Sequence, residues 1–300
     1  MKNCGTPLLE SLESRITLNG SAVAAVAEVH LSPVPATLSQ RQVVAGKTLA
    51  AAQANSAPAI AGRVARPQAG FASDTVLSNS ITGTASDGRV QIPYRLFVPA
   101  LTSPKQKVPL ILYLHGLGDG GTDNVAQTFW MSGLQAATAS GADAAFVLAP
   151  QLPSGWVFGI KGKTQAEGMN LTMIALQKAM KNPNVDLNRI YVTGVSMGAY
   201  GVWDILRRYP KLFAAAVPMS YGGDPSTAKT IARIPIWAFH GTDDTVKPVQ
   251  GTRAMIAALV AAGGTPWYTE IAGGGHYIWN SIYDKSSLYA WLFSKHKGRG

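Results

Sequence analysis

Short apolar runs alternate with helical patterns from about Asp74 to the end of the chain, and this alternation constrains the fold more than any other feature. The run VPLILYL at 108–114 is apolar on both faces, as is typical of a central strand in a parallel sheet. Strands that alternate with helices form βαβ units. The sequence therefore predicts an α/β fold, with a mostly parallel central sheet flanked by helices and little or no lid.

The same patterns give approximate bounds for the individual elements. An antiparallel pair is expected first, at 81–86 and 90–98, joined by the turn Asp87-Gly88. Further strands are expected at 108–114, 145–148, 190–193, 214–218, 236–239 and 267–271. Helices are expected at 125–139, 165–181, 197–209, 249–262 and 286–295, and Pro210 ends the third of them.

The first quarter of the chain differs from the rest in composition. Residues 21–70 are mainly Ala, Val, Ser, Pro and Gln, with few aromatic residues. Such a segment cannot bury enough apolar surface to offset the entropy lost on ordering. We therefore expect residues 1–74 to be a leader or low-complexity extension that is mostly disordered, and residues 75–300 to form one domain. The start also lacks the apolar stretch of about 7–15 residues that marks an ordinary signal peptide.

Composition argues against several classes of protein. Cys4 is the single cysteine among 300 residues, so neither a disulfide framework nor a thiolate metal site is expected. The sequence has no run of about 18 consecutive apolar residues that would predict a membrane-spanning helix. The net charge is +10, but the basic residues are scattered, and the densest group, Lys295, Lys297 and Arg299, is typical of a solvated helix end. We expect no nucleic-acid partner, no cofactor or metal, and a monomer.

The strongest local signal is Gly194-Val195-Ser196-Met197-Gly198, directly after the expected strand RIYVT. G-x-S-x-G between a strand and a helix is typical of a nucleophile elbow, a tight turn in which side chains at the glycines would collide with backbone. Ser196 would then stand exposed at a helix N-terminus, whose partial positive charge favours a developing oxyanion. The alternative is a serine that only caps the helix.

A nucleophilic serine needs a base, which on this class of fold follows it in the chain. Three histidines lie downstream of Ser196. His296 belongs to the basic tail, and His240 closes a strand, where orienting a loop is a more common role than catalysis. His276 lies in a glycine-rich loop after the last expected strand, from which an imidazole can reach the serine. We predict His276 as the general base.

The carboxylate that orients the base is expected in the loop HGTDDTV at 240–246. Asp243 and Asp244 both fit by position, and Asp224, after the strand AAAVP, is a third candidate. An aspartate without this role would serve as a turn residue or a helix cap. Position alone leaves the choice open.

An oxyanion hole needs two backbone N–H donors. One is expected from Met197, the residue after the nucleophile, and the other from the loop HGLGDGG at 115–121, where Leu117 has the right position. A glycine-rich loop can also hold a phosphate. However, this loop lacks the Lys-Ser/Thr ending of a P-loop and does not match G-x-G-x-x-G, which disfavours a phosphate site.

Together these features resemble the α/β-hydrolase superfamily, and within it the secreted carboxylesterase and predicted-peptidase branch that includes feruloyl-esterase-like and polyhydroxybutyrate-depolymerase-like enzymes. In such families the aspartate four residues after the histidine of the HG loop is the acid, which implies Asp244. The histidine of the GH-x-x-W element is the base, which implies His276. The resemblance covers about residues 78–295 and rests on HGLGDGGTDN at 115–124, APQLPSGW at 149–156, DLNRIYVTGVSMGAYGVWD at 186–204, HGTDDTVKP at 240–248 and GHYIWNSIYDKSSLYAWL at 275–292.

Two positions depart from the family pattern. The family often reads S-M-G-G, whereas Ala199 follows the second glycine here, and the first loop often reads H-G-x-G-E-R-G, whereas Asp119-Gly120 replaces the Glu-Arg pair. Loss of that arginine is expected to remove an ion pair that orders the loop. The resemblance also places the loops of Trp156 and Trp279 near the serine, so both are candidates for substrate contact, with core packing as the alternative.

The leader contains a second, shorter resemblance. LESRITLNG at 12–20 is similar to the LEPR-x-L-L-S targeting element on exported proteins of planctomycete-type bacteria. It implies a secreted, periplasmic or cell-surface location. A short amphipathic helix is the alternative, and a cytoplasmic location stays open.

The function implied by these features is a serine carboxylic-ester hydrolase that works through an acyl-enzyme on small, aromatic or polymer-linked esters. Its catalytic domain would be residues 75–300. A polyester depolymerase and a serine peptidase are the alternatives within hydrolases. The peptidase is disfavoured, because we expect no propeller-sized extra domain to gate peptides. A degenerate hydrolase-fold binding module is the alternative outside enzymes.

Overall fold

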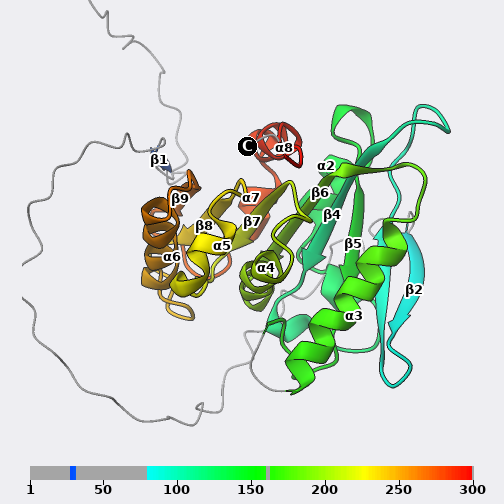
Figure 1. Cartoon of the computed structure of the whole chain (residues 1–300), viewed down its shortest axis with the longest axis horizontal. Coiled ribbons are helices and arrows are strands. Elements are labelled where there is room, and N and C mark those ends of the chain that lie inside the picture. Colours follow the sequence, from blue (N-terminus) through cyan, green and yellow to red (C-terminus); the bar gives the residue numbers. More distant parts are fainter. Residues whose placement is uncertain (1–27, 32–79, 160–162, 299–300) are drawn as a thin grey trace, which may run out of the picture.

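A computed structural model describes residues 28–31, 80–159 and 163–298 (Figure 1). Within these ranges the strands form one nine-stranded sheet in the order β1-β9-β8-β7-β6-β4-β5-β3-β2. The strands are β1 (Glu28–Leu31), β2 (Ser80–Ser86), β3 (Gln91–Phe97), β4 (Val108–Leu114), β5 (Phe146–Pro150), β6 (Val185–Val195), β7 (Ala215–Met219), β8 (Trp237–Gly241) and β9 (Trp267–Ile271).

The six strands from β4 to β9 are parallel to one another, and the antiparallel pairs lie at the two edges of the sheet. At one edge β2 pairs with β3, as the sequence predicts, and at the other β1 pairs with β9. All eight expected strands are present. β1 falls inside the predicted extension 1–74, the rest of which lies outside the described residues.

Helices cover both faces of the sheet. They are α2 (Ser132–Thr138), α3 (Lys163–Ala179), α4 (Met197–Arg208), α5 (Ala228–Ile231), α6 (Gln250–Ala261), α7 (Trp279–Tyr283) and α8 (Ser286–Phe293). Figure 1 shows α3, α4 and α6 on the face toward the viewer. Side chains along β4 alternate between the two faces of the sheet, which is why two layers form. Leu110 and Leu112 belong to the core under α3 and α4. Ile111 and Tyr113 belong to the core with α7 and α8.

One predicted helix is broken in the structure. The expected helix at 125–139 consists of a 3-10 turn at Ala126–Thr128 followed by the separate helix α2. Asp123 Oδ1 accepts the N–H groups of Val125 and Ala126, and the Thr128 hydroxyl donates to the Val125 carbonyl. These local side-chain hydrogen bonds compete with the backbone hydrogen bonds of a continuous helix. The spacing of apolar residues in the sequence does not reveal this competition.

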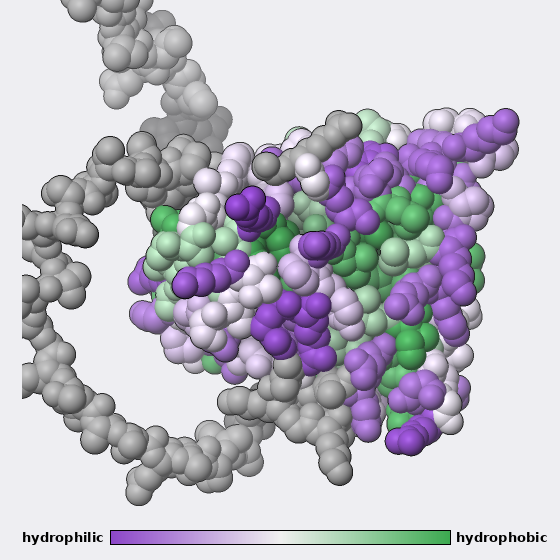
Figure 2. Space-filling view, in the orientation of Figure 1, coloured by the Kyte–Doolittle hydropathy of each residue, from purple (hydrophilic) through white to green (hydrophobic). Residues whose placement is uncertain are grey.

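A shallow apolar groove of about 440 Å³ lies between α3 and the chain after α4, lined in part by Met173, Met180 and Leu212. Figure 2 shows apolar surface in this region. α4 starts directly after Ser196 and spans roughly 18 Å, so the groove is distant from that serine. Within the described ranges, no helix is both long enough and apolar enough to cross a membrane.

Candidate active site

Ser196 occupies the turn between β6 and α4 in a strained backbone conformation. Its φ is 53° and its ψ is −118°, a region that costs a non-glycine residue free energy and that clusters at functional sites. A Cβ at Gly198 would lie 1.9 Å from the Leu114 carbonyl oxygen, so only glycine lets α4 approach β4 this closely. The Ser196 N–H donates to the Met219 carbonyl of β7, which fixes the turn at the carboxyl edge of the sheet.

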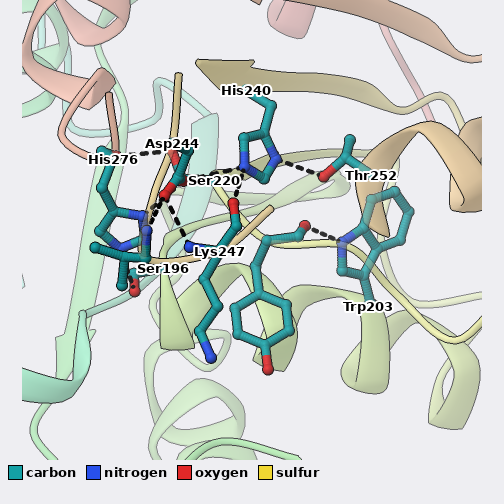
Figure 3. Close-up of polar contacts among 10 residues, drawn as sticks. Ser196, Trp203, Ser220, His240, Asp244, Lys247, Thr252 and His276 are labelled. Carbon is teal, nitrogen blue, oxygen red and sulfur yellow. Dashed lines mark hydrogen bonds and ion pairs between the residues drawn. The ribbon is translucent and has the colours of Figure 1, made fainter. Parts of the chain in front are cut away.

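Three side chains that are far apart in the sequence meet at this turn (Figure 3). His276 Nε2 lies 2.8 Å from Ser196 Oγ, and His276 Nδ1 lies 2.7 Å from Asp244 Oδ2. Asp244 and His276 are buried, and Ser196 is half-buried. Both His276 distances fit direct hydrogen bonds, so the imidazole can accept a proton from the serine while its other nitrogen donates to the carboxylate.

The two remaining aspartates face other partners. Asp243 is exposed, and its Oδ1 accepts from the Thr242 hydroxyl at 2.8 Å. Asp224 caps a short 3-10 turn by accepting the Ser226 N–H, which is the capping role expected of an aspartate outside the site. Of the three candidate carboxylates, Asp244 is therefore the one hydrogen-bonded to His276.

Gly241 allows the loops that carry Asp244 and His276 to touch. A Cβ at this position would lie 2.2 Å from the Gly274 carbonyl oxygen, a distance that a real side chain does not reach. The Asp243 N–H donates to the same carbonyl at 2.9 Å. The loop from His240 to Asp244 is therefore held by backbone packing against Gly274 as well as by the position of the carboxylate.

The electrostatics keep Asp244 ionised and His276 neutral. Burial alone would raise the pKa of Asp244, but N–H donation from Lys247, His276 and Val246 outweighs it and leaves that pKa below its ordinary value. Burial lowers the pKa of His276 below 6.5, and the Asp244 carboxylate offsets only part of this effect. At neutral pH the imidazole is therefore free to accept a proton.

The two predicted oxyanion donors belong to segments that adjoin the serine. Met197 is the first residue of α4 and Leu117 is the first residue of a 3-10 turn, positions at which an N–H has no acceptor within its own helix. A Cβ on Gly116 would lie 4.0 Å from the Ser196 Cβ, which places this loop against the nucleophile. The two N–H groups are thus candidates to hold a negative oxygen.

Buried polar groups order the loop that carries Leu117. Asp119 is buried, and its Oδ2 accepts the Gly116 N–H, while Gln151 donates to its carbonyl. His115 Nε2 accepts the Leu152 N–H, so its Nδ1–H donates to the Gly116 carbonyl. Burial lowers the pKa of His115 to about 4, which keeps the ring neutral. Hydrogen bonds therefore order this loop where the family pattern has a Glu-Arg pair.

Ser220 supports the loop of His276 and is not signalled by any sequence motif. It follows β7, is fully buried, and has a φ of 58°. Its hydroxyl donates to the His276 carbonyl at 2.9 Å, and its N–H donates to Phe239 of β8. A small polar residue directly after a buried strand is the only signal that sequence reasoning could have used.

The predicted tryptophans have different environments. Trp279 is 2% exposed, and its ring packs edge-on against His276 at 5.5 Å. It therefore supports the imidazole as part of the core, which is the alternative to the predicted position in the cleft. Trp130 and Tyr277, which the sequence does not single out, pack edge-on against Trp279 and reach the surface. Trp156 is half-buried against the core, and its contact with substrate stays a prediction.

The remaining histidines have separate settings. His296 lies close to Asp186 at the amino end of β6, the opposite end from Ser196. His240 is buried beside Asp244. Within the described ranges, no group of three His, Cys, Asp or Glu side chains could hold a metal ion.

Comparison with known proteins agrees with this architecture. The chain is similar to a thermostable esterase of known structure, at 35% identity and a TM-score of 0.68 over 74% of this chain and 64% of that one. The chain has the α/β-hydrolase fold, and it spans less than two thirds of that esterase's length. No family model matches it.

More distant similarities share the α/β-hydrolase fold. A ferulic acid esterase matches over 71% of this chain and 98% of that one, at 16% identity and a TM-score of 0.54. The acylaminoacyl peptidase of Pyrococcus horikoshii matches over 72% and 40%, at 15% identity and a TM-score of 0.55. A curated relative, the bifunctional acetylxylan esterase/xylanase XynS20E of Neocallimastix patriciarum, is 24% identical over 54% of this chain but only 22% of its own length.

Proposed function

We propose that this α/β hydrolase is a serine carboxylic-ester hydrolase. The observation that carries the proposal is the hydrogen-bonded row of Ser196, His276 and Asp244 at a strained strand-to-helix turn. A serine in this position, with a neutral base and a buried ionised carboxylate, fits acyl transfer. The similarity to a thermostable esterase supports an ester as substrate.

In the proposed mechanism, Ser196 Oγ attacks the acyl carbon while His276 Nε2 takes the hydroxyl proton. Asp244 holds the Nδ1–H tautomer and stabilises the imidazolium, and the N–H groups of Met197 and Leu117 hold the oxyanion. The intermediate collapses when Nε2–H protonates the leaving alcohol. Water, deprotonated by His276, then attacks the acyl-enzyme and releases the acid.

Apolar side chains at the rim of the site support esters with apolar groups. Leu117 is 46% exposed, Val246 is 53% exposed and Tyr277 is 51% exposed, and each follows the carboxyl end of a different strand. Val125 is also exposed, and Trp130 stacks on Tyr277 at 5.6 Å. Exposed apolar groups around a nucleophile favour contact with acyl or aryl groups.

The same rim favours a polyester depolymerase as the second candidate. An apolar rim that is open to solvent can rest on a chain or surface too large for a closed pocket. A peptidase has weaker support, because the peptidase similarities are below 25% identity and concern the fold alone. Export, a monomeric state and independence from cofactors stay part of the proposal, and the leader that suggests export lies outside the described residues.

Ester turnover by the purified full-length chain tests the proposal. We expect hydrolysis of p-nitrophenyl acetate and butyrate and of methyl ferulate, labelling by a fluorophosphonate probe at Ser196, and little cleavage of peptide p-nitroanilides. Monomer release from a polyhydroxybutyrate or aromatic polyester film would favour the depolymerase. Absence of both labelling and ester turnover would instead favour a degenerate binding module.

The pH profile is a second expected result. The base must be neutral to accept the serine proton, and burial lowers the pKa of His276. Activity is therefore retained as the pH falls below 6.5 and is lost only at the lowered pKa. We expect kcat/KM for p-nitrophenyl butyrate, measured across the pH range, to reach half its plateau below pH 6.5. A half-plateau clearly above that value would show that the imidazole is not the buried neutral base described here.

A further inference from the structure

His240 binds the carboxylate of Asp244 from the side opposite His276 (Figure 3). It lies near the end of β8 and is fully buried. Its Nε2 is 3.0 Å from Asp244 Oδ2 and 2.9 Å from the Lys247 carbonyl oxygen. Its Nδ1 is 2.7 Å from the hydroxyl of Thr252, a fully buried residue in the first turn of α6.

These contacts determine which ring nitrogen carries the proton. Both partners of Nε2 are acceptors, since one is a carboxylate oxygen and the other a carbonyl oxygen. Nε2 must therefore carry a hydrogen and donate. In the neutral ring Nδ1 is then an acceptor, and the Thr252 hydroxyl donates to it. Asp244 and the Lys247 carbonyl thus select the tautomer of His240, and the Thr252 hydroxyl satisfies the Nδ1 lone pair that this tautomer leaves.

Each carboxylate oxygen of Asp244 accepts two hydrogen bonds. Oδ1 accepts the N–H groups of Val246 and Lys247, both at 2.8 Å. Oδ2 accepts one imidazole N–H from His276 and one from His240. Because two rings share Oδ2, donation from His240 both holds that oxygen in place and withdraws part of its charge from His276.

We propose that His240 and Thr252 are positioning residues that extend the row of Ser196, His276 and Asp244 to five side chains and weaken the proton affinity of the base. The proposal rests on the proposed ester hydrolysis. It assigns the two residues no contact with substrate. They act on the reaction through Asp244.

The charged groups around the pair agree in sign with this effect. Burial lowers the pKa of His276 most, and Asp244 raises it. His240 and Lys247 also act on this pKa, and both lower it. On the other side, His240 faces Glu270 of β9, whose carboxylate is paired with Arg253 of α6. Removal of His240 leaves Asp244 Oδ2 to His276 alone, so the imidazolium becomes more stable.

The test compares His240→Leu with His240→Gln, because a glutamine amide can donate from a position close to Nε2. For His240→Leu we expect kcat to fall about 10–100-fold with little change in KM, and the acid limb of kcat/KM to move up by about 0.5–1 pH unit. His240→Gln should recover most of the rate and return the acid limb toward the wild-type position. Thr252→Val should show a smaller shift in the same direction, and Thr252→Ser should behave as wild type.

A purely structural role predicts a different pattern. Loss of activity in His240→Leu with an unmoved acid limb, or a His240→Gln variant no better than His240→Leu, would overturn the proposal. Thr252→Val decides the matter where His240→Leu does not fold, because its acid limb must still move upward relative to Thr252→Ser. Wild-type ester turnover and fluorophosphonate labelling are measured on the same preparation. Failure of the positioning proposal alone therefore leaves both intact, whereas failure of the proposed function removes both.

Discussion

Replacement of Ser196 with alanine is expected to lower kcat for p-nitrophenyl butyrate by about 10⁴–10⁶-fold. The hydroxyl is the proposed nucleophile, and no other hydroxyl is shown hydrogen-bonded to His276 Nε2 in the described part of the chain. The rate that persists would come from the oxyanion donors and from substrate binding. Fluorophosphonate labelling should disappear in the same variant.

The fold should tolerate this change, so the loss of rate can be assigned to chemistry. Alanine can occupy the strained φ of 53° at about the same cost as serine, and the N–H of residue 196 still donates to Met219. We expect a Tm within a few degrees of wild type. Ser287→Ala, on the exposed side of α8, is the matched control and should keep full activity. Equal turnover by Ser196→Ala and wild type would exclude the proposed mechanism.

The sheet was predictable because its strands have strong local signals. VPLILYL is apolar at every position, and this pattern needs a layer on each side whatever the rest of the chain does. The short helices α5 and α7 have only four and five residues, too few for a helical period to show. The break before α2 depends on where the side chains of Asp123 and Thr128 point.

The candidate site was predictable where its backbone geometry requires particular residues, such as glycine, at particular positions in the sequence. Glycines at 194 and 198 mark the elbow of Ser196, and the loop of His276 follows the last strand. His115, Ser220 and Thr252 leave no such mark, because each supports the site through a side-chain contact that depends on tertiary packing. The burial of Trp279 likewise depends on α7, which the sequence did not reveal.

The choice between two adjacent aspartates shows this limit most clearly. Adjacent side chains in a turn point in different directions, and no residue pattern records which direction is which. The structure places Asp243 at the surface beside Thr242 and turns Asp244 toward His276. The two aspartates can therefore be compared directly by experiment, because Asp243→Asn and Asp244→Asn make the same chemical change at adjacent residues.

Asp244→Asn is therefore expected to lower kcat by about 10⁴-fold, whereas Asp243→Asn should leave it close to wild type. All four groups that contact Asp244 are donors, and asparagine offers only one acceptor oxygen. Its amide NH₂ must then face either His276, which favours the wrong tautomer, or the N–H groups of Val246 and Lys247. We also expect a lower Tm for Asp244→Asn, since buried donors lose their acceptor.

Steady-state kinetics with p-nitrophenyl butyrate and thermal unfolding of both variants check this expectation. Asp243→Asn loses only the hydrogen bond from Thr242 at an exposed position, so it controls for any general effect of an asparagine in this loop. A large loss of rate in Asp243→Asn together with a nearly normal Asp244→Asn would reverse the assignment. That outcome would require the loop to rearrange in solution until the neighbouring carboxylate reached the imidazole, at the cost of the four hydrogen bonds to Asp244.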